Sequence, residues 1–206
     1  PEVRNAFDEA MIGDLTAAFA GLGEAPGIRA IVLTGEGKIF CAGADVSWMR
    51  RAAAYSPEEN REDARRMARM LRTIDTCPRP VIGSIRGAAI GGGVGLAAVC
   101  DIAIAARGTV FSLAEVKLGI LPAAISPYVL RAIGARNARD LFLTGERFDA
   151  EEARRVGLVH AIAEEADLEA AVGRRIDALL SSGPEAVAAA KRLIDTVAPL
   201  TIDAAF

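Results

Sequence analysis

Two stretches of small residues are the first candidates for chemistry in this sequence. They are FCAGADVSWM, residues 40–49, and RGAAIGGGVGLAAVCD, residues 86–101. Glycines at the start of a helix leave backbone N–H groups exposed, and the positive end of the helix dipole strengthens their field. Such groups can hold a developing enolate or alkoxide oxygen. A second donor must come from another loop, and the N–H of Ala44 is our candidate.

The glycine-rich stretch has three other possible interpretations. A dinucleotide-binding fingerprint that starts at Gly91 would need glycine at position 96, where the chain has Leu96. A P-loop would need a Gly-Lys-Ser/Thr sequence, which does not follow. Close packing of a helix against a sheet also explains small residues. Close packing and an anion-holding site therefore both remain open.

Glu115 is the side chain with the best prospects for proton transfer. It lies among apolar neighbours in FSLAEVKLGI, and burial there would raise its pKa toward neutrality, which suits an acid–base catalyst. The alternative is a surface glutamate that pairs with Lys117 or a nearby arginine. His160 is the only histidine, and we expect a structural role for it. A G-x-S-x-G nucleophile motif is absent from the sequence.

Composition predicts one globular domain. The chain has 206 residues and a net charge of −3, with 52% apolar and 25% charged residues. Acids and bases are interleaved, so we expect no nucleic acid partner; the locally basic segment 61–73 predicts a solvated helix face. No apolar run approaches the ~20 residues that cross a bilayer, and no signal peptide is visible, so we expect no membrane partner.

The cysteines and the chain ends carry two further expectations. Cys41, Cys77 and Cys100 are odd in number and lie in apolar settings, which predicts free thiols in a reducing, cytoplasmic compartment. The chain begins with Pro1 and stops at APLTIDAAF, so we expect a fragment trimmed at both ends.

Strands and helices alternate along the chain, which predicts the α/β class. Helices are predicted over residues 7–22, 56–75 and 94–100, and mostly helix from residue 126, with a last helix from near Pro184. Strands are predicted over residues 28–35, 80–87, 101–106, 109–116 and 158–163, and residues 38–45 are predicted as a brief strand that enters a loop of small residues. Capping boxes are predicted for Ser56 with Glu59 and for Asp149 with Glu152.

Four segments in register carry a resemblance to a known family. They are FCAGAD from residue 40, GGGVGLAAVCDIAIAA from residue 91, EVKLGILP from residue 115 and LTGERFDAEEARRVGLVHAI from residue 143. Together they resemble the crotonase superfamily, also called the enoyl-CoA hydratase/isomerase family, over nearly the whole chain. Within it, the segments resemble the methylglutaconyl-CoA hydratase type.

The resemblance implies a crotonase-type spiral of ββα turns with a C-terminal helical trimerisation region. Residues 1–145 would form the spiral acyl-CoA-binding core, and residues 146–206 a mainly helical region of the same domain. The protein would then assemble as a homotrimer or as a hexamer of two trimers.

The resemblance also implies the site. An acyl-CoA thioester would bind with its oxygen between the N–H groups of Ala44 and Gly92. The residues implied for thioester and CoA binding are Ala42, Ala44, Asp45, Val46, Ser47 and Gly92. Asp45 would serve loop geometry more than proton transfer. The acyl-pocket candidates are Trp48, Met49, Gly95 and Pro122. Coenzyme A would arrive as part of the substrate, with no separate cofactor and no metal.

Hydratases of this family commonly use two carboxylates, and the chain keeps one of them. Glu115 occupies one position, whereas Gly95 stands at the other. Three functions stay open: hydration of a short or branched 2-enoyl-CoA, such as a methylglutaconyl-like thioester; Δ3,Δ2-enoyl-CoA isomerisation by a single glutamate; and binding of CoA thioesters without turnover.

Overall fold

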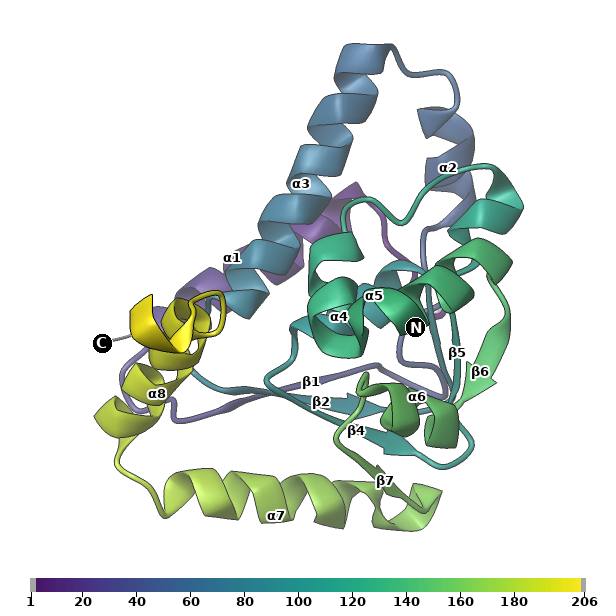
Figure 1. Cartoon of the computed structure of the whole chain (residues 1–206). Coiled ribbons are helices and arrows are strands. Elements are labelled where there is room, and N and C mark those ends of the chain that lie inside the picture. The colour runs from purple at the N-terminus through teal and green to yellow at the C-terminus, as the bar shows by residue number, and fades with distance from the viewer. Residues whose placement is uncertain (1–2, 205–206) are drawn as a thin grey trace.

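The computed structural model describes residues 3–204 and confirms the α/β class (Figure 1). The helices are α1 (Glu9–Glu24), α2 (Val46–Ala52), α3 (Pro57–Asp75), α4 (Gly92–Val99), α5 (Ser126–Thr144), α6 (Ala150–Val156), α7 (Leu168–Leu180) and α8 (Pro184–Val197). The strands are β1 (Ile31–Thr34), β2 (Val81–Ile85), β3 (Ala88–Ile90), β4 (Ile102–Ala106), β5 (Val110–Ser112), β6 (Arg147–Asp149) and β7 (Ala161–Ala163). Short 3₁₀ helices cover Ala114–Leu118, Glu165–Asp167 and Ile202–Ala204.

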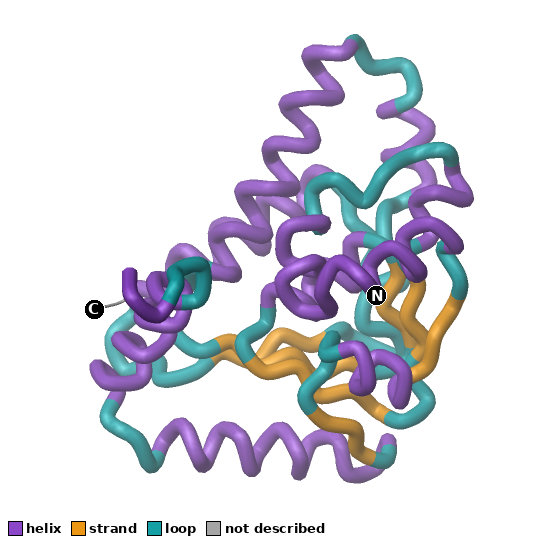
Figure 2. The backbone as a smooth tube through the Cα atoms, in the orientation of Figure 1, coloured by secondary structure: helices purple, strands orange, loops and turns teal. Residues whose placement is uncertain are grey.

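Two sheets form the centre of the molecule. The larger has the order β1-β2-β4-β7 and is parallel throughout. The smaller has the order β3-β5-β6, and its strands run across the direction of the larger sheet (Figure 2). A parallel strand covered on both faces reads as a continuous apolar run, and all five residues of β2 are buried. β6 pairs with β5 and β7 with β4, so residues beyond 145 add a strand to each sheet.

Helices cover both faces of the larger sheet. Figure 1 shows α7 along one face and α4 and α5 on the other. Leu168 and Val172 of α7 pack against Ile82 and Ile104 of the sheet in a small separate core. The main core lies on the opposite face. In this core α4 is buried almost all round, which explains why its sequence has no polar face.

The two predicted helix starts in the capping-box pattern behave differently. Ser56 accepts from the Glu59 N–H at 3.2 Å, and the Glu59 carboxylate accepts from the Ser56 N–H at 2.7 Å, so the first box is confirmed. Asp149 accepts from the Glu152 N–H at 2.8 Å, but the Glu152 side chain pairs with Arg155 instead of returning to the cap. The second box is therefore only half formed, because a guanidinium one turn away competes for that carboxylate.

Three expected elements differ in the structure. Residues 38–45 form no regular strand; Cys41 and Ala44 make isolated bridges to Ala89 and Phe7. The stretch 109–116 is a strand only at its start, and Ala114–Leu118 winds into a 3₁₀ helix, so Glu115 lies on a turn. The first helix begins at Glu9, because the Asp8 carboxylate accepts from the Met11 N–H at 2.8 Å and caps it there.

Candidate active site

The first N–H group of helix α4 is that of Gly92, and it points away from the hydrogen bonds of the helix. Gly91 holds φ at 51° before the helix, a conformation that favours glycine. Its carbonyl oxygen accepts from the N–H groups of Val94 and Gly95, at 2.9 Å and 3.3 Å. In a trans peptide the C=O and N–H groups point in opposite directions, so the Gly92 N–H points away from the helix. Over residues 3–204 it has no acceptor.

The same geometry turns the Ala44 N–H outward in the loop before α2. The Phe7 N–H donates to the Gly43 carbonyl at 2.7 Å, and the Asp45 N–H donates to the Phe7 carbonyl at 2.8 Å. Because the Gly43 carbonyl points at Phe7, the Ala44 N–H of the same peptide points the other way. It too lacks an acceptor in the described part of the chain.

The small residues at the start of α4 are closely packed against three other segments. A Cβ on Gly92 would lie 2.7 Å from Cε2 of the Phe7 ring and 3.0 Å from Cε of Met67. A Cβ on Gly93 would lie 2.8 Å from the Cys41 carbonyl oxygen. Real Cβ atoms do not approach other atoms so closely. The small residues are therefore closely packed, although against Phe7, Met67 and the loop at Cys41 where a sheet was expected, and the Cys41 contact brings the start of α4 against the loop that carries Ala44.

Glu115 places a carboxyl group beside the start of α4. A Cβ on Gly91 would lie only 2.9 Å from the Glu115 Oε1 atom. The side chain is half-buried, and its Oε2 is buried without a hydrogen-bond partner in the part of the chain that the structure describes. Burial raises the pKa of the Glu115 carboxyl above its ordinary value, although a hydrogen bond from its own N–H acts in the opposite direction. Within residues 3–204 no salt bridge includes Glu115, so the structure does not show the alternative of a surface glutamate paired with Lys117 or a nearby arginine.

The residues expected along the CoA path gather at the start of α2. The Asp45 carboxylate accepts from the Trp48 N–H at 2.9 Å and caps the helix, as expected for a residue that shapes the loop. Val46 and Ser47 are exposed, whereas Ala42 is partly buried. Trp48 and Met49 are half-buried on the same helix, and Pro122 is buried beyond Glu115.

Gly95 has no free space around it. A Cβ there would lie 2.2 Å from Cγ2 and 2.8 Å from Cβ of Ile125, and 3.8 Å from Leu71. Ile125 is itself 3% exposed. The Ile125 side chain thus fills the space that a carboxylate side chain at position 95 would need. The assignment of Gly95 to the acyl pocket remains a prediction.

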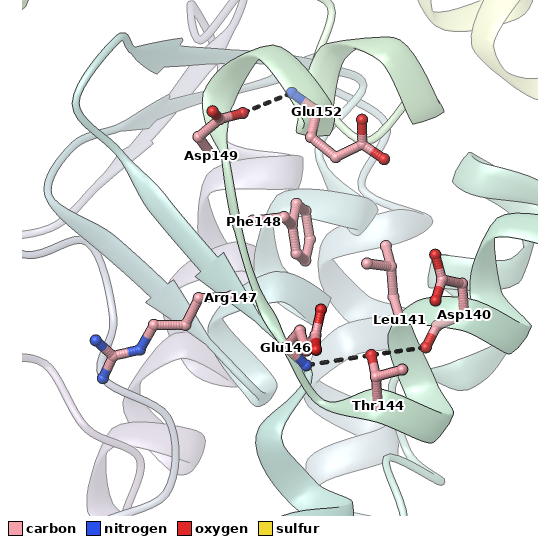
Figure 3. A pocket seen from close by; sticks show the side chains of 8 residues that line it. All are labelled: Asp140, Leu141, Thr144, Glu146, Arg147, Phe148, Asp149 and Glu152. Carbon is pink, nitrogen blue, oxygen red and sulfur yellow. Dashed lines mark hydrogen bonds between the residues drawn. The ribbon is translucent and has the colours of Figure 1, made fainter.

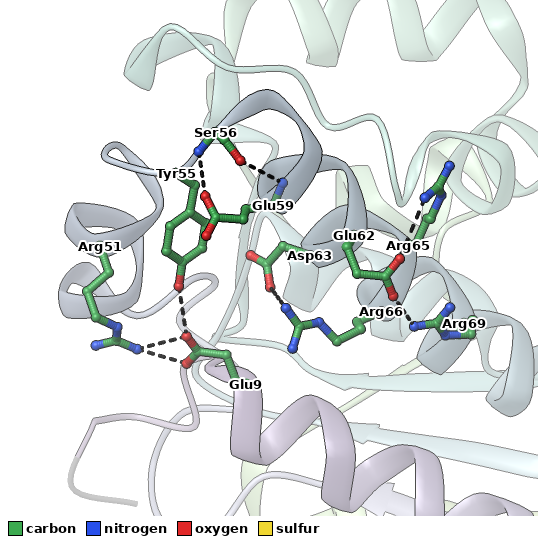
Figure 4. Close-up of polar contacts among 10 residues, drawn as sticks. All are labelled: Glu9, Arg51, Tyr55, Ser56, Glu59, Glu62, Asp63, Arg65, Arg66 and Arg69. Carbon is green, nitrogen blue, oxygen red and sulfur yellow. Dashed lines mark hydrogen bonds and ion pairs between the residues drawn. The ribbon is translucent and has the colours of Figure 1, made fainter.

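Polar contacts fix α2 on the neighbouring helices (Figure 4). Glu9 of α1 accepts from the Arg51 guanidinium at 2.8 Å and from the Tyr55 hydroxyl at 3.3 Å. The outer face of α3 carries ion pairs such as Arg69 with Glu62 at 2.7 Å, whereas Met67 and three other apolar side chains of α3 face the core. The basic segment 61–73 is therefore the solvated helix face that its spacing predicts.

Other hollows of the structure are lined by different residues. One of about 320 Å³ lies between the end of α5, β6 and α6, and includes Asp140, Arg147 and Glu152 (Figure 3). Another of about 580 Å³ lies beneath α8, beside Asp101 and Lys191. Neither contains an expected site residue. His160 borders the second, and its Nδ1 accepts from the Ala103 N–H at 3.0 Å, which is the structural role expected for it.

One residue of this region, Phe7, is not singled out by the sequence. It contacts Gly92, yet it stands in no motif and resembles any other buried apolar residue. Ile125, which the sequence offers as a residue that narrows the acyl pocket beyond Pro122, lies against Gly95. Residues 3–204 contain no group of three or more His, Cys, Asp or Glu side chains placed to hold a metal ion. None of their helices is long and apolar enough to cross a membrane.

Curated proteins of similar sequence are named as enoyl-CoA hydratases. The enoyl-CoA hydratase AKT6-1 of Alternaria alternata is 37% identical over 198 residues, which cover 94% of this chain and 63% of that protein. The chain likewise spans 63% of the length of ACTT6, an enoyl-CoA hydratase of the same organism. The curated relatives are therefore substantially longer than the chain.

Solved structures agree closely with this fold. An enoyl-CoA hydratase from Shewanella pealeana has a TM-score of 0.95 and 41% identity, covering 99% of this chain and 77% of that one. Pseudomonas aeruginosa AtuE has a TM-score of 0.95 and 41% identity, covering 100% of this chain and 80% of that one. The family model described as enoyl-CoA hydratase/isomerase matches residues 1–204. The chain belongs to the enoyl-CoA hydratase/isomerase family, the crotonase superfamily, as its sequence motifs indicate.

Proposed function

We propose that the chain binds an acyl-CoA thioester and transfers a proton at the carbon next to the thioester carbonyl. The thioester oxygen accepts from the N–H groups of Ala44 and Gly92, and Glu115 moves the proton. The observation that carries this proposal is the approach of the Glu115 carboxyl to Gly91, which directly precedes the outward Gly92 N–H. A hydrogen-bond donor that can stabilise negative charge and a carboxyl group that can carry a proton therefore both lie beside the start of α4.

The two N–H groups stabilise the negative charge that develops on the thioester oxygen as the enolate forms. Fixed backbone donors need no reorganisation during the reaction, and removing one donor of this kind typically costs about 2.7–4 kcal/mol of transition-state stabilisation. Glu115 works in a partly dehydrated setting that raises its pKa, which brings its acid and base forms closer to balance near neutral pH. CoA lies along residues 42–47, and no separate cofactor or metal takes part.

Hydration of a 2-enoyl-CoA is the reaction we favour, because the relatives are named as enoyl-CoA hydratases. The substrate is a short or branched acyl thioester. A methylglutaconyl-like substrate carries its own carboxylate, which would help to orient the attacking water in place of the missing second glutamate. Assembly as a trimer or hexamer belongs to the same proposal.

Isomerisation of a 3-enoyl-CoA to a 2-enoyl-CoA is the second candidate, and the packing of Gly95 favours it. Hydration gains from a second carboxylate that activates water, whereas Ile125 fills the space beside Gly95. A 1,3-proton shift needs one group that removes a proton from one carbon and returns it to another. Glu115 alone satisfies that requirement.

Ultraviolet absorbance of conjugated and non-conjugated enoyl-CoA thioesters tests these proposals. Loss of the conjugated band from a 2-enoyl-CoA indicates hydration, and gain of that band from a 3-enoyl-CoA indicates isomerisation. No change in either, with the thioester still bound, would support the non-catalytic alternative. Glu115→Gln should abolish the dominant activity and retain thioester binding, whereas Glu36→Gln, an exposed glutamate, should change neither. Normal turnover by Glu115→Gln would exclude the role given to Glu115.

A further inference from the structure

We infer that Phe7 is a positioning residue that holds the N–H groups of Ala44 and Gly92 in a common geometry. The inference rests on the proposed function, since it concerns the donors of that site. Phe7 belongs to neither loop. It lies two residues before α1 begins at Glu9. It is the residue of this third segment that contacts both loops, with its backbone on one and its ring on the other.

The backbone of Phe7 sets the direction of the Ala44 N–H. Its N–H and C=O hold the Gly43 carbonyl and the Asp45 N–H at 2.7 Å and 2.8 Å, so the peptide on each side of Ala44 is fixed. Gly43 itself has φ of 91°, and a Cβ there would lie 3.0 Å from the Ile90 carbonyl oxygen. A loop held at both peptides cannot rotate the N–H between them without breaking these bonds.

The ring of Phe7 sets the position of Gly92. Phe7 is 1% exposed, and its Cε2 and Cδ2 atoms lie 2.7 Å and 3.0 Å from the place of a Gly92 Cβ. Gly92 is outside the left-handed region of φ, so an alanine there meets no backbone strain. The ring, with the end of Met67, is what leaves no space for a side chain. Any shift of the ring therefore moves or frees the first turn of α4.

An ordinary core role for Phe7 predicts a loss of stability and nothing more. A positioning role predicts a change in the polarisation of the bound thioester, which a loss of stability does not produce. Phe19 supplies the matched control, because it is a phenylalanine of the same core, 4% exposed, and lies on α1 about 15 Å along the axis from the helix start at Glu9.

The experiment compares Phe7→Leu with Phe19→Leu in the full chain. We measure the red shift of the ultraviolet band of a bound conjugated aryl-enoyl-CoA, which reports polarisation of its carbonyl, with kcat, KM and thermal stability. Phe7→Leu should reduce the red shift and lower kcat on the order of 10- to 100-fold with little change in KM, as misplaced catalytic groups do. Phe19→Leu should leave the red shift and kcat near wild type.

Each other outcome has a defined meaning. A normal red shift in the wild type with equal red shifts in the two leucine variants would overturn the role of Phe7 and leave the proposed function intact. No red shift in the wild type would overturn both. If Phe7→Leu does not fold, Phe7→Met replaces it, with the same two outcomes.

Gly92→Ala extends the test. Its effect on the red shift should be smaller in the Phe7→Leu background than in the wild type, because the ring that opposes the new methyl group has gone. Additive effects of the two substitutions would count against coupling between the ring and the amide.

Discussion

Replacing Gly95 by alanine should destabilise the protein, although glycine to alanine normally stabilises a helix. The added methyl group would lie 2.2 Å from Cγ2 and 2.8 Å from Cβ of Ile125. Ile125 is 3% exposed and stands at the start of α5. The opposing atoms belong to the branch point next to its backbone, so rotation of a flexible end cannot relieve the contact. Either α4 or the start of α5 must shift.

The size of the effect follows from two opposing contributions. Overpacking of a core by a methyl group typically costs about 1–3 kcal/mol, and a contact at a branch point belongs at the upper end of that range. Replacing glycine inside a helix gains about 1 kcal/mol from helix propensity. We therefore expect a net loss of roughly 2 kcal/mol. Among the described residues 3–204, nothing lies within 4 Å of the methyl group that Gly13→Ala would add on α1, so this change should instead gain up to about 1 kcal/mol.

Urea unfolding of four variants measures these differences. Gly95→Ala and Gly13→Ala should shift the midpoint in opposite directions at a constant slope. Ile125→Ala alone should cost about 2–5 kcal/mol, but the double variant with Gly95→Ala should be more stable than the sum of the two predicts, by about 1 kcal/mol or more. A Gly95→Ala protein as stable as Gly13→Ala, or strictly additive effects with Ile125→Ala, would refute the packing argument. The same steric argument predicts that Gly95→Glu cannot supply a second carboxylate while Ile125 is present.

Four further predictions address charge and burial. Glu115→Gln should lower kcat by about 10²–10⁴-fold, and in the wild type kcat for α-proton removal should rise as pH rises through the raised pKa of this carboxyl. Because that pKa is raised in the folded state, the free energy of unfolding should fall as pH rises through it, and Glu115→Gln should flatten this slope; an unchanged slope would contradict the burial argument. Burial raises the pKa of Cys100 to about 12 and that of Cys41 to about 11, so iodoacetamide at mildly alkaline pH should label these buried thiols only after unfolding; rapid labelling of the native protein would contradict this. Lys191→Met should cost about 3 kcal/mol in urea unfolding, because it leaves the Asp101 carboxylate without its partner at 2.8 Å, and no loss would show that the pair is dispensable.

The regular elements could be predicted from the sequence where their pattern is long. The helix Pro57–Asp75 has its cap, its proline and nineteen residues of apolar period, and it lies where they predict. Short elements are harder to predict, because they contain too few residues for a clear apolar pattern. β3 has only three residues, and β5 ends at Ser112, after which the apolar run continues into a 3₁₀ helix. An apolar run of that length is compatible with either conformation, so the pattern alone could not place Glu115 on a turn.

The candidate site, too, could be predicted from the sequence only in part. Glu115 and the two glycine-containing loops are visible in the sequence because their residue types are unusual for their surroundings. Their mutual approach is not visible, because it depends on contacts such as Ile125 against Gly95, made between segments about 30 residues apart. Such contacts use common apolar residues, and nothing local marks them.

The structure also shows why close packing and exposed donors belong to the same interpretation of the small residues. Gly92 has no room for a Cβ, because the protein packs against it; its freedom from a side chain serves the approach of Phe7. In each loop the carbonyl of the preceding residue, Gly43 or Gly91, is held by a hydrogen bond within the protein. A trans peptide then leaves its N–H no direction except outward. Tight internal pairing is therefore the cause of the two N–H groups that have no acceptor within residues 3–204, so a substitution that loosens the packing should disturb the donors before it disturbs the fold.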